Sequence, residues 1–333
     1  MKPSARPPGD PALVAALRAR AAGRPAIGFA EFMEVALYEP GAGYYRRPGP
    51  RIGYGPGTDF LTATVSAPLL GRLVAAACAA LLGPGAAARH EFVEVGAEPG
   101  AGILGPGPHP FRGSRQVRVG EPLRIAGPCV VFSNELLDAQ PFRRFRFRAG
   151  AWRELGVSLS GDAPAEAELA PSPAPPAPLP ASAPEGYVID APFASAELVG
   201  RIAREPWSGL FLALDYGRSW REIALESPGG TARAYRGHAQ VRDLLDAPGR
   251  QDITCDVCWD WLAAALSAGG FAEPRVDSLE AFLAGHCAEL IAAVASEEAP
   301  RLSRDKLSLL QLLHPAHLGQ RYQALWALRP APA

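Results

Sequence analysis

The sequence predicts an α/β fold with a mostly parallel sheet. Short apolar runs typical of buried strands recur along the chain, at residues 91–95, 129–132 and 210–214. Segments with helical spacing of apolar residues alternate with these runs, at residues 66–82, 194–202 and 259–266. Glycine or polar residues follow each strand directly, and an open parallel sheet binds its ligands at that edge.

The other elements follow in chain order. Residues 13–24 predict a first helix because Leu13, Leu17 and Ala21 recur at helical spacing, although a basic transit peptide is the alternative. Residues 27–60 are rich in glycine, proline and aromatic residues, which indicates a lobe of loops and short helices. Alternating phenylalanines and arginines predict a strand at residues 142–148, and a last helix is expected at 304–313.

Composition and charge exclude several classes of protein. The 333 residues are 48% hydrophobic and carry a net charge of −1, which argues against a nucleic acid or an anionic membrane as partner. The arginine-rich strand at 142–148 is therefore interpreted as an exposed amphipathic strand. The first ten residues lack the apolar core of a secretory signal, and the apolar stretch at 69–82 is too short to span a bilayer.

The cysteines and histidines do not predict a metal site. Five scattered cysteines make a disulfide scaffold an unattractive interpretation. Cys255 and Cys258 form a lone CxxC without a second pair, so ordinary thiols are expected. His314 and His317 lie close together in sequence, and helix-end packing is the simpler interpretation.

A glycine-rich turn follows the first predicted strand. Its glycines are Gly96, Gly100 and Gly102. Glycines at this edge of a sheet let the backbone approach a ligand and adopt positive φ. A simple strand-terminating turn is the alternative.

A polar segment follows the second buried strand. It contains Asn134, Glu135 and Asp138, and the two carboxylates would share a face if the segment turns helically. Paired carboxylates can grip a guanidinium group in a bidentate manner. A helix-capping, solvent-exposed acidic pair is the alternative.

Several segments together resemble one enzyme family. They are residues 29–45, 59–63, 134–141, 215–217, 233–238, 248–254 and 314–328, in the order in which the family carries them. The chain thus resembles the S-adenosylmethionine-dependent methyltransferases related to the mitochondrial complex I assembly factor, which methylates a protein arginine.

The resemblance implies a Rossmann-like class I methyltransferase. We expect an N-terminal lobe at residues 1–65 and a core at 66–333. The core should contain a helical insertion in its second half and a flexible Pro/Ala-rich insertion at 163–184, whose composition cannot form a packed core. Residues 314–328 should form a closing helix.

The resemblance also implies a site and a partner. S-adenosyl-L-methionine should be held by the residues Gly96, Gly100, Gly102, Asp59, Tyr45 and Asn134, and catalysis should involve Glu135, Asp138 and Asn134. A protein substrate and a cytoplasmic location are expected, without nucleic acid, membrane or metal, and a homodimer is left open.

The sequence departs from the family in its glycine loop. Residues 96–102 expand the loop, and residues 103–118 offer neither a clear helix nor the acid that would hold the ribose hydroxyls. Glu121 is the only nearby candidate for that acid. These departures leave open a catalytically degenerate methyltransferase fold that serves as an assembly or binding factor.

Overall fold

The computed structural model describes residues 10–47, 67–97, 99–100, 102–161, 163–170, 178–296 and 303–331. The predicted Asp59 lies outside the described residues. The chain divides into two compact units. Unit 1 comprises residues 1–60, 138–195 and 218–258, and unit 2 comprises 61–137, 196–217 and 259–333.

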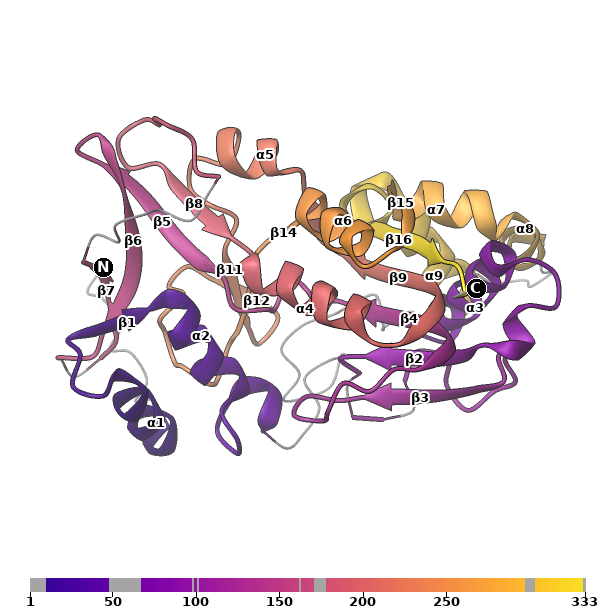
Figure 1. Cartoon of the computed structure of the whole chain (residues 1–333), viewed down its shortest axis with the longest axis horizontal. Helices are drawn as coiled ribbons and strands as arrows, with labels where there is room; N and C mark the ends of the chain where they lie inside the picture. Colours follow the sequence, from indigo (N-terminus) through magenta and orange to yellow (C-terminus); the bar gives the residue numbers. More distant parts are fainter. Residues whose placement is uncertain are drawn as a thin grey trace. The chain divides into compact units, whose positions relative to one another are not determined.

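Unit 2 contains a six-stranded sheet in the order β15-β16-β9-β4-β2-β3 (Figure 1). The strands are β2 (Glu91–Val95), β3 (Gly113–Val117), β4 (Gly127–Asn134), β9 (Trp207–Asp215), β15 (Ala272–Ser278) and β16 (Gln323–Arg329). β3, β2, β4 and β9 are parallel, whereas β16 runs antiparallel to both β9 and β15. The α/β, Rossmann-like prediction is therefore confirmed.

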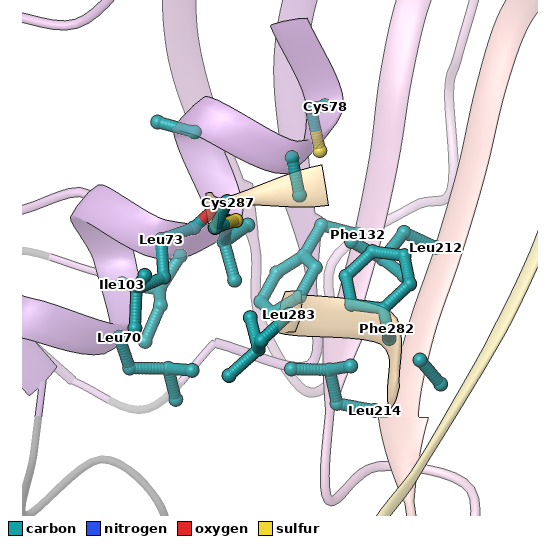
Figure 2. Packing of buried hydrophobic residues seen from close by; sticks show 14 of the residues in the cluster. Leu70, Leu73, Cys78, Ile103, Phe132, Leu212, Leu214, Phe282, Leu283 and Cys287 are labelled. Carbon is teal, nitrogen blue, oxygen red and sulfur yellow. Dashed lines mark hydrogen bonds between the residues drawn. The ribbon is translucent and has the colours of Figure 1, made fainter. Parts of the chain in front are cut away.

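Helices of unit 2 cover one face of this sheet. They are α3 (Ala67–Leu82), α7 (Leu279–His286), α8 (Ala288–Ser296) and α9 (Arg304–Leu313), and the last three lie between β15 and β16. Figure 2 shows the core that they form, in which Phe132, Leu212 and Leu214 of the sheet pack with Phe282 and Leu283 of α7. Even-numbered residues of β4 and β9 fill this core because side chains of a strand alternate between faces.

The remaining elements of unit 2 are short. They are η3 (Ala87–Arg89), α6 (Trp259–Ala268) and the π-turn η4 (Pro315–Gly319). Two elements run across the unit boundaries, α4 (Phe193–Arg204) and β10 (Gly217–Arg218). None of the helices in the described ranges, taken singly, has the length and apolar character of a membrane span.

Unit 1 is built on a sheet in the order β1-β6-β5-β8, with β7 paired to β6. Its strands are β1 (Ala26–Gly28), β5 (Arg143–Arg148), β6 (Ala151–Ser158), β7 (Ala165–Glu168) and β8 (Val188–Ala191). A second sheet has the order β12-β11-β13, from β11 (Arg233–Arg236), β12 (Ala239–Val241) and β13 (Asp252–Thr254). The remaining elements are α1 (Pro11–Ala21), α2 (Phe29–Tyr38), η1 (Tyr44–Arg46), α5 (Trp220–Leu225) and β14 (Val257–Cys258).

Helix α2 joins the N-terminal segment to the first sheet of unit 1. It buries Phe29, Phe32 and Met33, and Glu31 in its first turn accepts a hydrogen bond from Gly28 N at 2.9 Å. Phe29 packs on Phe142, with ring centroids 5.1 Å apart. The N-terminal lobe that we expected at residues 1–65 thus groups with two later stretches of chain.

One prediction about an element is wrong, and another concerns a segment of which the structure describes only a part. Residues 314–328 do not form a closing helix, because β16 is an antiparallel strand between β15 and β9. Part of the segment at 163–184 is ordered: β7 pairs with β6, and the indole N–H of Trp152 donates to Pro180 O at 2.7 Å. Glu166 and Glu168 of β7 also form exposed ion pairs with Arg146 and Arg148.

The arginine-rich strand is β5. Phe145 and Phe147 are buried, whereas the arginines form ion pairs with acidic residues.

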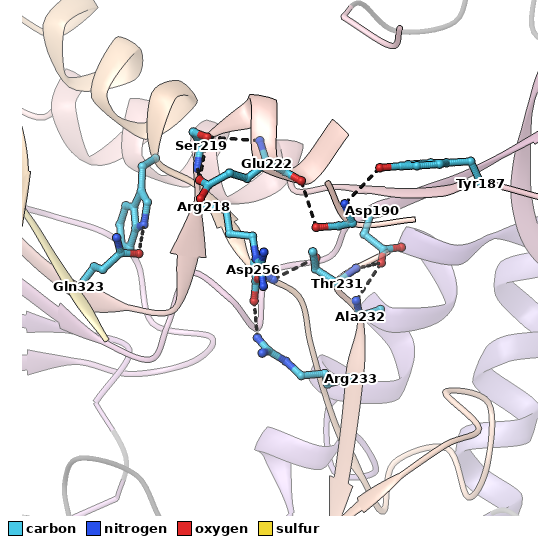
Figure 3. A network of polar contacts seen from close by, with 12 residues as sticks. Tyr187, Asp190, Arg218, Ser219, Glu222, Thr231, Ala232, Arg233, Asp256 and Gln323 are labelled. Atoms are coloured by element: carbon cyan, nitrogen blue, oxygen red, sulfur yellow. Dashed lines mark hydrogen bonds and ion pairs between the residues drawn. The ribbon is translucent and has the colours of Figure 1, made fainter. Parts of the chain in front are cut away.

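Figure 3 shows polar contacts of unit 1, in which the fully buried Asp190 accepts backbone hydrogen bonds from Thr231 and Ala232, both at 2.8 Å. Arg144 neutralises the same carboxylate at 2.7 Å.

Candidate active site

The sheet of unit 2 has a topological switch beside β2. The chain passes from β2 outward to β3 and then returns to β4 on the opposite side of β2. Ligands of open α/β sheets bind at such a switch, outside the carboxyl ends of the strands. In unit 2 that place lies between the ends of β2 at Val95 and β4 at Asn134.

Two glycines shape the turn after β2. Gly96 has φ +81°, and a Cβ there would lie 2.5 Å from Cδ1 of Leu136. Gly102 has φ +70°, and a Cβ there would lie 2.5 Å from Oε2 of Glu94. Both positions favour glycine because of their positive φ, and the neighbouring side-chain ends would have to move to admit a Cβ. Gly100 also has positive φ, but its Cβ direction is open and the residue is exposed.

Glu94, a residue of β2, binds the backbone of the segment that follows this turn. Its Oε2 accepts a hydrogen bond from Ile103 N at 2.9 Å, and the residue is 9% exposed. Burial raises the pKa of this carboxyl, although the hydrogen bond and Arg118 oppose the shift. Glu94 was not among the predicted site residues. Its position two residues before Gly96, in an apolar strand, was the available signal.

A cavity of about 310 Å³ lies beside Glu94. Residues of β2, of β3 and of the segments that flank β3 line it, among them Phe92, Glu94, Ser114, Arg115, Gln116, Arg118 and Glu121. Glu121 accepts a hydrogen bond from Arg118 N at 2.8 Å. As expected, residues 103–112 contain no helix, and the segment leads directly into β3.

The end of β4 places Asn134 and Glu135 in unit 2. Glu135 N donates to Leu214 O at 3.0 Å, and Glu135 adopts φ +48°. The segment is therefore not helical, so Glu135 and Asp138 do not share a helical face as the spacing suggested. Asp138 belongs to unit 1, where Cys255 N donates to its carbonyl oxygen at 3.0 Å.

Buried polar groups surround the end of β4. Asp215 is fully buried, and its carboxylate accepts hydrogen bonds from Leu137 N and Tyr216 N, both at 2.9 Å. It thereby fixes the segment after Glu135. Ser133 Oγ is buried without a hydrogen-bond partner among the described residues, directly beside Asn134. Such a group is available to a ligand.

Tyr45 lies in unit 1. Its hydroxyl donates to Asp252 Oδ1 at 2.7 Å, and its ring stacks on Tyr38 with centroids 5.5 Å apart. Burial, and next the Asp252 carboxylate, raise the pKa of Tyr45 well above its ordinary value. Its predicted role toward the donor, like that of Asp59, stays a prediction.

No group of three or more metal-ligating side chains occurs within the described ranges. Cys255 and Cys258 are buried thiols, and burial raises the pKa of Cys255 well above its ordinary value. His314 Nδ1 accepts a hydrogen bond from Ala316 N at 3.1 Å, as expected for a helix-end residue.

Comparisons with known proteins agree with this arrangement. A family model described as "Putative S-adenosyl-L-methionine-dependent methyltransferase" matches residues 117–274. The mitochondrial protein arginine methyltransferase NDUFAF7 of Danio rerio is 26% identical over 149 residues, or 41% of this chain. The match spans about a third of that relative's length, 32%.

Two crystal structures share the fold over nearly the whole chain. Both are COG1565 superfamily proteins from Burkholderia thailandensis. One, bound to S-adenosyl-homocysteine, has a TM-score of 0.80 and 25% identity over 99% of this chain and 96% of its own. The other has a TM-score of 0.78 and 24% identity over the same shares. The chain is therefore similar in fold, and in part of its sequence, to this group of S-adenosyl-L-methionine-dependent methyltransferases.

Proposed function

We propose that the chain transfers a methyl group from S-adenosyl-L-methionine to an arginine side chain of a protein. The observation that carries this proposal is the pair of glycines, Gly96 and Gly102, in the turn that follows β2 at the switch of the sheet. The similar Burkholderia protein was crystallised with S-adenosyl-homocysteine, the product of such a transfer.

The residues of unit 2 fit the donor. Gly96 and Gly102 give the chain after β2 positive φ angles that other residues adopt only under strain, and Ser133 offers a buried hydroxyl without a partner among the described residues. We assign the amino-acid part of the donor to this turn. The cavity beside Glu94 suits the adenosine, where Glu121 would take the role of the missing ribose-binding acid. A carboxylate can accept hydrogen bonds from both ribose hydroxyls.

The chemistry needs alignment more than strong acids or bases. The donor, when bound, supplies a methyl group on a positively charged sulfur. The protein must hold the acceptor nitrogen in line with that methyl group, because orientation supplies much of the rate. Glu135 would hold a guanidinium by charge-assisted hydrogen bonds and stabilise it as a proton leaves.

Arginine as the acceptor is supported by the zebrafish relative, which is a protein arginine methyltransferase. The site itself supports a cationic acceptor with several N–H donors, since a glutamate follows β4 directly. Arginine fits this description better than lysine because its planar group can bind a carboxylate through two parallel hydrogen bonds.

Two measurements test the proposal. Calorimetric titration with S-adenosylmethionine should show one site, and transfer from labelled donor to proteins of a cell extract should label arginine, as read by mass spectrometry. A labelled residue other than arginine would refute the acceptor and leave the methyltransferase assignment intact. Absence of both binding and transfer would refute the whole proposal in favour of a catalytically degenerate fold.

A further inference from the structure

Tyr322 reaches Asn134 from a distant part of the chain. Its hydroxyl donates to Asn134 Oδ1 at 2.8 Å and lies 3.1 Å from Leu214 O. O–H···O hydrogen bonds are normally 2.5–3.0 Å long, so the hydroxyl proton belongs to the shorter contact. The oxygen of the Asn134 amide thus accepts a hydrogen bond from Tyr322. The two N–H groups of the same amide are then the groups that can bind a ligand.

The position of the Tyr322 hydroxyl is rigidly set. The side chain is fully buried, and its ring packs on Tyr216 with centroids 4.8 Å apart. Its backbone is held on both sides, because Tyr322 N donates to Leu318 O at 2.9 Å and Leu279 N donates to Tyr322 O at 2.8 Å. Tyr322 directly precedes β16, which lies beside β9, and β9 lies beside β4 (Figure 1).

We propose that Tyr322 is a positioning residue that turns the N–H donors of Asn134 toward the carboxylate of the donor's amino-acid part. A guanidinium carries only donors and cannot accept from an amide N–H, whereas a carboxylate accepts readily. Asn134 therefore serves the methyl donor, and Glu135 serves the acceptor. This inference rests on the proposed function, because it needs S-adenosylmethionine in this site.

The test compares two ligands that differ in the amino-acid part. S-adenosylhomocysteine carries the carboxylate, and 5′-methylthioadenosine lacks it. Both are titrated by calorimetry into wild type, Tyr322→Phe, Asn134→Ala and the double variant. We expect Tyr322→Phe to weaken S-adenosylhomocysteine about fivefold and Asn134→Ala about tenfold, as for one hydrogen bond to a charged group. The affinity for 5′-methylthioadenosine should stay within about twofold of wild type.

The double variant separates positioning from general damage. If Tyr322 acts through Asn134, Tyr322→Phe causes no further loss once Asn134 is alanine. Tyr187→Phe is the matched control, because it removes a hydroxyl of unit 1 that accepts from Ser227 N at 3.1 Å. It should leave both affinities unchanged. If Tyr322→Phe fails to fold, Asn134→Ala, at a half-buried position, still tests the carboxylate contact on which the inference depends, and equal losses for both ligands in that variant would overturn it.

Three results would overturn the inference: an unchanged S-adenosylhomocysteine affinity in Tyr322→Phe, additive losses in the double variant, or equal losses for both ligands. Wild type that binds neither ligand would instead refute the proposed function. Binding with normal affinities in all variants would refute only the role of Tyr322 and Asn134.

Discussion

Glu135 combines an unusual backbone conformation with a charged side chain at the end of β4. Its φ of +48° is in the left-handed region, which costs a residue other than glycine about 1–2 kcal/mol. Such outliers cluster at functional sites, where the surrounding structure holds them in place. Here the hydrogen bond from Glu135 N to Leu214 O supplies part of that constraint.

Removing the charge of Glu135 should slow methyl transfer without unfolding the protein. Glu135→Gln keeps the shape and loses a charge-assisted hydrogen bond, so we expect kcat/KM for the acceptor to fall about 10- to 100-fold. The donor affinity from calorimetry should not change. Glu135→Gly is the companion variant: it relieves the backbone strain, so the unfolding free energy should stay within about 1 kcal/mol of wild type while transfer is lost. A stable, fully active glycine variant would contradict the assignment.

Glu94 should make the stability of unit 2 depend on pH. Burial raises its pKa above 4.5, so the folded state keeps a proton that the unfolded state has already lost. Its contribution to stability is therefore fully present below pH 4.5 and is lost as pH rises through the raised folded pKa. Glu94→Gln should abolish this part of the pH dependence, because an amide oxygen can still accept from Ile103 N. Urea unfolding at several pH values above 4.5 gives the free energy of unfolding of wild type and of Glu94→Gln. The same dependence of this free energy on pH in both proteins would refute the prediction.

At the scale of elements, Arg329 ties three segments of unit 2 together. Its guanidinium donates to Gly269 O at 3.2 Å, after α6, and to Glu205 O at 2.9 Å, before β9. It also donates to Trp207 O and lies over the Trp207 ring, 4.9 Å from its centroid. The side chain thus binds backbone carbonyls that helix and strand ends leave without partners.

Arg329→Lys should destabilise unit 2 by about 2–4 kcal/mol, because a lysine cannot reach several carbonyls with a planar fork or stack on the indole. Arg275→Lys is the matched control: Arg275 lies over the Trp326 ring at 5.5 Å but is exposed, so the change should cost less than about 0.5 kcal/mol. Chemical unfolding followed by tryptophan fluorescence measures both. Equal effects of the two substitutions would contradict this role of Arg329.

Elements with a strong apolar pattern could be predicted, and others could not. β2, α3 and α9 follow their predicted bounds to within a residue, because β2 is a continuous buried run that a glycine ends and the two helices carry apolar residues at helical spacing. β16 was mistaken for a helix because its short apolar run, buried between two strands, carries no distinctive period. β3 was missed because an edge strand of mostly polar residues shows no alternation.

The candidate site, too, could be predicted from the sequence only in part. Gly96 and Asn134 could be predicted because each follows an apolar run at a strand end, so their place at the edge of the sheet is a local property. The bond between Tyr322 and Asn134 joins residues 188 positions apart, and no local pattern indicates it. Glu94 is an intermediate case. Its place in a buried strand can be predicted from its sequence neighbours, but its hydrogen bond with Ile103 N depends on how the following turn folds.

At the scale of the whole molecule, the chain builds its two units from interleaved segments. Unit 2 supplies Gly96, Gly102, Asn134 and Glu135, whereas unit 1 contains β7 and the neighbouring proline-rich residues. A segment of low apolar content can still be ordered where its backbone pairs with a neighbouring strand, as β7 does with β6. Stability and donor binding should therefore respond separately to changes in these two regions.

Replacing residues 163–184 with a short Gly-Ser linker tests this separation. The change removes β7, its two ion pairs, and the acceptors of Trp152 at 2.7 Å and Trp220 at 3.2 Å. Lengthening or shortening a loop alone costs about 1 kcal/mol or less, so the lost strand should bring the total to about 1–3 kcal/mol in unit 1. Glu166→Gln with Glu168→Gln is the control that removes only the exposed ion pairs, which solvent screens and which should therefore change stability little. Donor affinity should stay within about twofold of wild type in the linker protein and in the control, because the proposed contacts of the donor belong to unit 2. Thermal unfolding measures the stability and calorimetric titration the donor affinity. A linker protein as stable as wild type, or one that loses donor binding, would refute the prediction that the two properties respond separately.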